Sequence, residues 1–140
     1  MAAMKIIALN KKALHDYEIL EKIEAGISLI GKEVRAIRDG KVQLTGSYAK
    51  ILNNELWLLN SHVGVLEDPE RTRKLLVKKV ELKRLYGKVM EKKLTLIPLR
   101  MYFKNNMAKV ELGLGRGMKN YDKRQQIKQR DLDREIRSGK

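Results

Sequence analysis

Hydrophobic and polar residues alternate most regularly over residues 107–114, MAKVELGL, where every second position is apolar. This period of two is typical of a β-strand with one buried face. A second apolar run, residues 94–103, precedes it, and Lys104-Asn105-Asn106 forms a polar turn between the two. The pattern therefore predicts a β-hairpin. Pro98 lacks a backbone donor, so we expect an edge or a bulge at that point of the first strand.

A second predicted hairpin consists of the apolar-rich runs 47–52 and 55–59, which flank Asn53-Asn54. Asparagine tolerates the left-handed conformation that a tight two-residue turn requires. Trp57 lies in the second run with leucines on both sides. We expect it to pack in the core rather than to stack on a base.

The first thirty residues contain shorter patterns. We expect residues 1–14 to form a loose arm with a short helical turn. Residues 16–20 and 27–31 are apolar-rich and predict two strands, joined by an acidic turn that contains Gly26.

Two segments have apolar residues at helical spacing. Residues 32–39 predict a short helix that ends before Gly40, a residue free to adopt a positive φ. Residues 71–88 carry leucines and valine at helical spacing before Gly87, and most of the remaining positions are basic. A basic amphipathic helix lies on a membrane, docks on a partner, or packs on its own core while presenting charge to RNA. We favour the last, because the flanking strands need a cover for their apolar face.

Residues 116–140 are too polar to form a core of their own. Beyond Met118 the aliphatic residues are Ile127, Leu132 and Ile136, at spacings that give only a broken helical stripe. Between positions 116 and 130 there are six Lys and Arg and one acid, Asp122. A polar segment of this kind is a solvated appendage or is ordered by a polyanionic partner. Glycines at 113, 115 and 117 are expected to make the chain flexible before the tail begins. This favours a tail that is ordered by a polyanionic partner.

Length and pattern together predict the fold class. A chain of 140 residues holds one domain with a real core. We expect a mainly β fold, an OB-type antiparallel barrel of about six strands with two or three short helices, over residues 1–115. A basic tail, disordered when free, follows over residues 116–140.

The net charge of the chain indicates which classes of partner it can bind. There are 31 Lys and Arg against 17 acids, a formal net charge of +14, which suits nucleic acid or an anionic membrane. No apolar run reaches the roughly 18 residues of a spanning helix, and the first residues lack the apolar region of a signal peptide. We expect a monomeric cytoplasmic protein without a membrane partner.

Candidate chemistry other than RNA binding is sparse. The glycines around Arg116 lack the spacing of a nucleotide-binding loop. There is no cysteine, and His15 and His62 lack metal-ligand spacing. We therefore predict no catalytic residue, no metal, no cofactor and no enzyme activity, although catalytic groups that meet only in space leave an RNA-processing enzyme as a distant alternative.

Aromatic residues supply possible stacking groups. Tyr121 lies in the polar tail, flanked by Lys119, Lys123 and Arg124, so contact with a base or ribose is its expected use. The other candidates are expected at core or rim positions: Tyr17, Tyr48, Tyr86, Tyr102 and Phe103.

Several runs in order along nearly the whole chain resemble the SmpB family, the tmRNA-binding proteins of bacterial trans-translation. These runs are IALNKKALHDYEI (7–19), IEAGISLIGKEVRAIRDGK (23–41), DPERTRKLL (68–76), TLIPLRMYFKNNMAKVELGLGRG (95–117) and YDKRQQIKQRD (121–131). The resemblance implies an OB-type barrel that binds the tRNA-like domain of tmRNA and delivers it to the vacant decoding site of a stalled ribosome. There it substitutes for codon–anticodon pairing, so that the stalled chain is tagged for degradation.

The resemblance also implies site residues. The tmRNA-contacting positions of the family fall on Asn10, Glu24, Leu76 and Lys109. Without the resemblance, Glu24 reads as a solvated turn carboxylate and Leu76 as a core residue.

The tail is implied to become helical in the mRNA channel near the decoding centre. Its expected ribosome-engaging residues are Gly117, Lys119, Tyr121, Asp122, Lys123, Arg124 and Lys128. The alternative is another OB-type RNA-binding or ribosome-associated protein without tmRNA specificity.

Overall fold

The computed structural model describes residues 4–117. Its helices are α1 (Lys11–Asp16), α2 (Gly31–Arg38) and α3 (Lys79–Lys92). Its strands are β1 (Met4–Leu9), β2 (Tyr17–Ile27), β3 (Val42–Gln43), β4 (Tyr48–Leu52), β5 (Glu55–Leu59), β6 (His62–Val63), β7 (Arg73–Leu76), β8 (Thr95–Lys104) and β9 (Met107–Gly117). The prediction of a mainly β fold is confirmed, and the predicted tail lies almost entirely outside the described residues.

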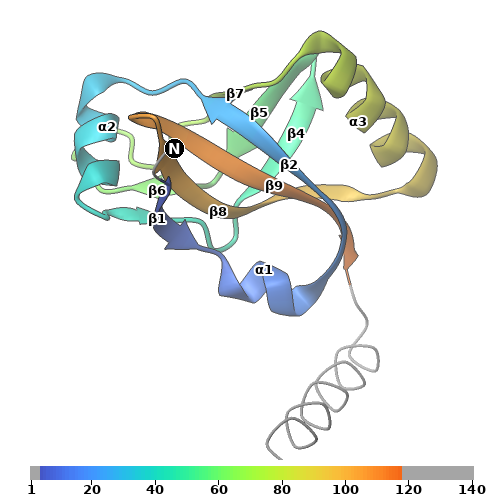
Figure 1. The fold of residues 1–140 in the computed structure, drawn as a ribbon, viewed down its shortest axis with the longest axis horizontal. Coiled ribbons are helices and arrows are strands. Elements are labelled where there is room, and N and C mark those ends of the chain that lie inside the picture. The colour runs from blue at the N-terminus through green and yellow to red at the C-terminus, as the bar shows by residue number, and fades with distance from the viewer. Residues whose placement is uncertain (1–3, 118–140) are drawn as a thin grey trace, which may run out of the picture.

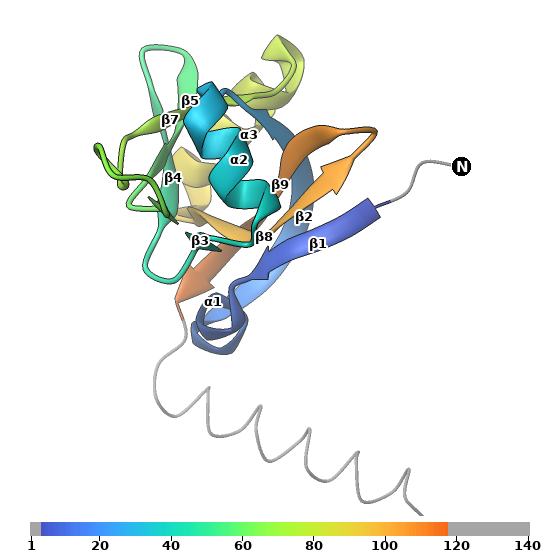
Figure 2. The same ribbon diagram turned by 90° about the vertical axis from the view of Figure 1, so that its left-hand side faces the viewer.

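Six strands form a closed antiparallel ring in the order β8-β4-β5-β7-β2-β9, and β9 pairs back onto β8. Figures 1 and 2 show this ring, with α2 and α3 at different sides of it. Ala36 and Ile37 of α2 and Leu85 of α3 join the core that the inward-facing strand residues form. The six-strand ring expected from the sequence is confirmed, and strand β1 is added to it through β8.

Both predicted hairpins are confirmed. In the β8–β9 hairpin Asn105 and Asn106 adopt φ values of 53° and 62°, and the register shifts between Pro98 and Arg100 as expected for a bulge. In the β4–β5 hairpin Asn53 and Asn54 adopt φ values of 51° and 60°. The turn asparagines make both registers readable from the sequence, because a two-residue turn fixes which residues face each other.

The glycines near the end of β9 do not loosen the chain as predicted. Gly115 pairs with Ile19 on β2, and β9 stays paired as far as Gly117. A Cβ added at Gly115 would lie 2.6 Å from the Glu18 carbonyl oxygen, and one at Gly113 would lie 2.9 Å from Leu99 Cδ1. The absence of a side chain therefore permits close packing of the backbone here.

The N-terminal predictions need two corrections. Residues 1–14 were expected to form a loose arm, but β1 pairs with β8 and only α1 matches the expected helical turn. The expected strands 16–20 and 27–31 are parts of the single strand β2, whose residues 21–26 form no turn. Ile23, Ala25 and Ile27 of β2 are buried at every second position. The segment therefore has the period of two of a strand, although its composition is typical of a turn.

Helix α2 confirms the prediction for residues 32–39, and Gly40 follows with φ of 75°. The helix predicted over residues 71–88 is wrong in its first half. Residues 73–76 form β7, and α3 starts only at Lys79 and continues through Gly87 to end before Lys93, which has φ of 52°. Strand pairing overrides the helical spacing, because β7 fills the gap between β5 and β2.

Trp57 was expected in the core, and this prediction is wrong. Its neighbours Leu56 and Leu58 are buried in the ring, whereas Trp57 is half-buried on the outer face of β5. Its cross-strand partners are Lys50 on β4 and Lys74 on β7. The alternation of β5 decides this orientation, since only every second side chain reaches the interior.

Helix α3 is held against β2 by ion pairs to Glu21. Arg84 Nη2 lies 2.6 Å from Glu21 Oε1, and Lys88 Nζ lies 2.7 Å from Oε2. The hydrogen bond from Arg84, followed by that from Lys88, lowers the pKa of Glu21 to about 2. The carboxylate is therefore charged well into the acidic range.

We expect Glu21→Gln to lower the free energy of unfolding at neutral pH. A carboxyl group with a depressed pKa in the folded state stabilises the protein above its unfolded pKa, and this contribution is lost as the pH falls through the folded value. The difference between wild type and variant should be constant above about pH 5.5 and shrink between the ordinary value of 4.5 and about 2. Urea unfolding over this range measures it, and a difference that stays constant down to pH 2 would contradict the assignment.

Candidate nucleic-acid interface

Three of the four residues expected to contact RNA lie together on the outer face of the ring. Gly26 on β2 pairs with Leu76 on β7 and with Lys109 on β9. Glu24 lies two residues before Gly26 on the same face of β2, because side chains alternate along a strand. These residues line one surface hollow, together with Val77, Lys78 and Glu81. Glycine at the centre adds no side chain to the hollow between Glu24, Leu76 and Lys109.

Glu24 supplies a charged acceptor at the rim of this hollow. Its Oε2 accepts a hydrogen bond from the Tyr102 hydroxyl and lies 3.6 Å from Lys104 Nζ. The tyrosine hydrogen bond lowers the pKa of Glu24, and Lys104 and Lys109 add to the effect against the opposing influence of burial. An ionised carboxylate only accepts hydrogen bonds. The lone pairs of Glu24 that remain exposed therefore suit amino, imino or ribose hydroxyl donors.

Tyr102 holds that carboxylate in place from β8, on the same face of the sheet as Lys109. Its side chain is buried, and burial together with the Glu24 contact raises its pKa above the ordinary value, so the hydroxyl stays protonated and donates. Arg100 lies 5.7 Å from the centroid of its ring and pairs with Glu111 at 2.9 Å. Tyr102 was expected at the core or rim as a possible stacking group, and the structure gives it a positioning contact instead.

Lys109 and Leu76 complete the set with a cation and an apolar surface. Lys109 is half-buried on β9, directly across from Tyr102 on β8 and Gly26 on β2. Leu76 is 50% exposed on β7, so it is not the core residue that its composition alone indicates. A carboxylate, a cation and an exposed aliphatic side chain can contact base or ribose donors, phosphate and a sugar or base face, respectively.

Asn10 does not join these three residues. It caps the N-terminus of α1 and is buried, and its Nδ2 donates to the carbonyl oxygens of Pro98 at 2.9 Å and Leu44 at 3.2 Å. Its Oδ1 accepts from the Ala13 backbone N–H. Both amide hydrogens and the amide oxygen of Asn10 therefore bond within the fold, where they position the start of α1.

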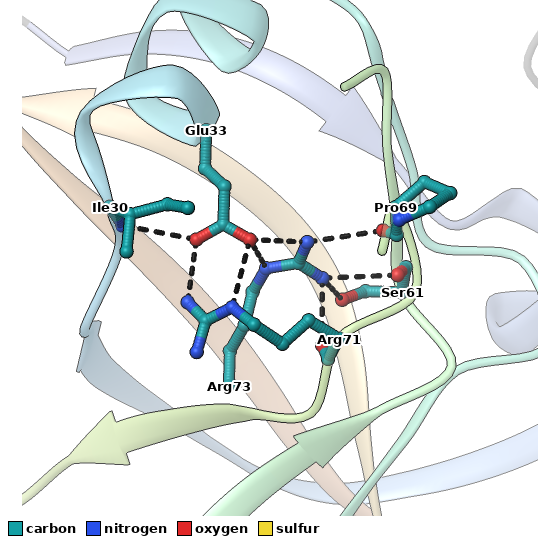
Figure 3. A network of polar contacts seen from close by, with 6 residues as sticks. All are labelled: Ile30, Glu33, Ser61, Pro69, Arg71 and Arg73. Atoms are coloured by element: carbon teal, nitrogen blue, oxygen red, sulfur yellow. Dashed lines mark hydrogen bonds and ion pairs between the residues drawn. The ribbon is translucent and has the colours of Figure 1, made fainter. Parts of the chain in front are cut away.

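The basic residues of segment 71–88 are less available than expected. Arg73 was assigned to a charged helix face, but it is fully buried on β7 and its Nη2 lies 2.5 Å from Glu33 Oε2. Figure 3 shows this network, in which Arg71 also contacts Glu33 and the Arg73 guanidinium reaches Ser61 and the Pro69 carbonyl. Arg73 therefore stabilises the fold and does not face RNA.

This buried network was missed by sequence reasoning. The available signal was the alternation in RKLL, where Arg73 and Leu75 share one face and Lys74 and Leu76 the other. Reading the segment as a helix concealed it.

The remaining site predictions concern the tail. Gly117 is the last described residue and pairs with Tyr17. The other expected ribosome-engaging positions lie outside the described residues: Lys119, Tyr121, Asp122, Lys123, Arg124 and Lys128. Within residues 4–117, no group of His, Asp or Glu is arranged to hold a metal ion. The same part of the chain has no helix long and apolar enough to cross a membrane.

Comparisons with known proteins identify the family of the chain. The family model described as SmpB protein matches residues 7–139. An SsrA-binding protein of Carboxydothermus hydrogenoformans is 56% identical over 139 residues, covering 94% of this chain and 93% of the relative. The SsrA-binding protein of Geobacter sulfurreducens is 49% identical, covering 94% and 91%.

A solved structure gives the same answer for the fold. Its description names tmRNA-SmpB and the center of the bacterial ribosome. The two structures match with a TM-score of 0.65 and 47% sequence identity, over 85% of this chain and 92% of the other. The sequence runs, the closed ring and these matches all lead to one assignment: this chain belongs to the SmpB family.

Proposed function

We propose that this protein is an RNA-binding adaptor of trans-translation, which binds the tRNA-like domain of tmRNA and brings it to the vacant decoding site of stalled ribosomes. The observation that carries the proposal is the convergence of Glu24, Leu76 and Lys109 around Gly26 on one outer face. Its relatives are described as SsrA-binding proteins. The related solved structure is described as tmRNA-SmpB in the bacterial ribosome.

The proposed recognition reads RNA shape rather than a base sequence. The hollow is lined by a few charged and apolar side chains, which include the carboxylates Glu24 and Glu81, the lysines Lys78 and Lys109, and Leu76 and Val77. So small a set suits recognition of local shape and charge rather than a base-by-base code. A folded loop whose bases and riboses are splayed outward presents donors, phosphate and apolar edges close together. Substitution for codon–anticodon pairing does not require the protein to make or break a covalent bond, as expected for an RNA-binding family. Because ribosomes are the place of action, the proposed location is the cytoplasm.

A competitive gel-shift titration tests this proposal. The full chain is titrated against tmRNA and against an ordinary tRNA at low and at physiological salt, because a protein with a net charge of +14 binds any RNA when ionic strength is low. Preference for tmRNA that persists at physiological salt is the expected result. Equal affinity for both RNAs at that salt would favour an OB-type RNA-binding protein without tmRNA specificity.

We further propose that the tail engages the decoding centre and mRNA channel. Its support is the sequence alone, in which Tyr121 and Asp122 are followed by Lys123 and Arg124. A triple variant, Asp122→Ala, Lys123→Ala and Arg124→Ala, should retain tmRNA affinity to within about threefold but lose tagging of stalled chains, because removing two positive charges and one negative charge weakens a distant RNA contact only slightly. Gel shift and a reconstituted tagging assay measure the two effects. Parallel loss of tmRNA binding would contradict this division of roles.

A further inference from the structure

A second feature of the outer surface lies on β5 and its two neighbours. Trp57 stands half-buried on the outer face of β5, directly between Lys50 on β4 and Lys74 on β7. The Lys50 side chain is exposed, and that of Lys74 is 43% exposed. An indole flanked on both sides by ammonium groups presents one stacking surface and two phosphate-binding charges along a single row.

This row is continuous with the hollow around Gly26. Lys74 and Leu76 share the outer face of β7, since they are two residues apart in one strand. Leu76 borders the Gly26 hollow, and it also lines a second hollow together with Lys74 and Glu55. The outer face of β7 therefore joins the Glu24–Lys109 side to the Trp57 side without an intervening element.

We propose that Trp57 is a stacking platform for an unpaired base of the RNA that is bound at Gly26, with Lys50 and Lys74 contacting the adjoining phosphates. This inference rests on the proposed tmRNA function and extends its binding surface across β7 onto β5. Charge complementarity favours RNA as the occupant, because lysines border the indole on both flanking strands. Glu55 lies 3.6 Å from Lys74 in an exposed ion pair, so a phosphate would displace a weakly held carboxylate there. Base stacking on an aromatic side chain tolerates any base identity, which suits recognition by shape.

Intrinsic fluorescence provides a direct test, since Trp57 is the single tryptophan of the chain. The full-length protein is titrated with tmRNA at physiological salt, with excitation at the red edge of the indole band, where RNA absorbs little, and with free tryptophan as the control for light absorbed by the RNA. Stacking should quench the emission along the same binding curve as a gel shift and protect Trp57 from acrylamide. Saturated tmRNA binding without any change in emission or acrylamide accessibility would overturn the proposal.

Variants test the energetic role. Trp57→Leu should weaken tmRNA binding about tenfold and Trp57→Phe by less, because stacking on one aromatic residue is worth about 1–3 kcal/mol. Tyr86→Leu serves as the matched control, since Tyr86 is a half-exposed aromatic residue on α3 outside the Lys50–Trp57–Lys74 row. Thermal melting confirms that each variant is folded. Equal losses in the Trp57 and Tyr86 variants, or no loss in Trp57→Leu, would refute a specific stacking role.

The outcomes separate this inference from the proposed function. If tmRNA is bound with preference over tRNA but Trp57 is unaffected, the inference fails and the function stands. If tmRNA is not preferred, the function fails, and with it the premise of the inference. If a ribosomal protein quenches the Trp57 emission and RNA does not, the Lys50–Trp57–Lys74 row is a protein-docking surface. That result would likewise overturn the stacking role.

Discussion

Glu33→Gln should be among the most destabilising single substitutions in this protein, lowering the free energy of unfolding by about 3–5 kcal/mol. Glu33 is 1% exposed and pairs with Arg73, which is fully buried, and also with Arg71, which is 35% exposed. Burial by itself would raise the pKa of Glu33, but the hydrogen bonds from Arg71 and Arg73 outweigh it and the pKa is lowered. An arginine cannot escape burial by losing its proton, so removal of the carboxylate leaves an uncompensated charge inside the protein.

Urea unfolding of the variant measures this loss. Glu81→Gln is the matched control, because Glu81 accepts from Arg84 at the surface of α3, where ion pairs contribute about 0–1 kcal/mol. Adding Arg73→Met to Glu33→Gln should recover part of the loss by removing the buried cation. A cost below about 1 kcal/mol in Glu33→Gln would show that the network is dispensable for stability.

Lys109→Glu should have the largest effect on RNA binding, weakening tmRNA affinity about tenfold to a hundredfold at physiological salt. Lys109 lies across from Gly26 and Tyr102 in the centre of the candidate interface. The substitution removes the proposed phosphate contact and adds a carboxylate close to Glu24, whose charge Lys109 stabilises. The added negative charge would then repel the phosphates of the RNA proposed to bind here.

The matched control for this prediction is Lys32→Glu. Lys32 is exposed on α2, and the change in net charge is identical. Gel-shift titrations at several salt concentrations separate a local contact from the general field, since only a lost phosphate contact reduces the slope of affinity against salt. Equal weakening by the two substitutions would show that Lys109 contributes through net charge alone.

The errors of prediction have a common physical origin. Residues 73–76 carry both a helical spacing of leucines and a strand alternation, and local sequence cannot choose between them. Pairing with β5 and β2 decides for the strand, which buries Arg73 and exposes Leu76. The same competition explains β2, where an acidic turn composition concealed the inward alternation of Ile23 and Ala25.

The sequence alone determined the two asparagine hairpins, the bulge near Pro98, helix α2 with Gly40 and the mainly β ring, because turn residues and side-chain periodicity act locally. Its resemblance to the SmpB family also located Glu24, Leu76 and Lys109. Only the tertiary structure decided that these three meet around Gly26, that Asn10 is a buried cap, and that Trp57 faces outward between two lysines. These facts depend on which strands become neighbours, and that choice is made by burial of the whole core rather than by any one segment.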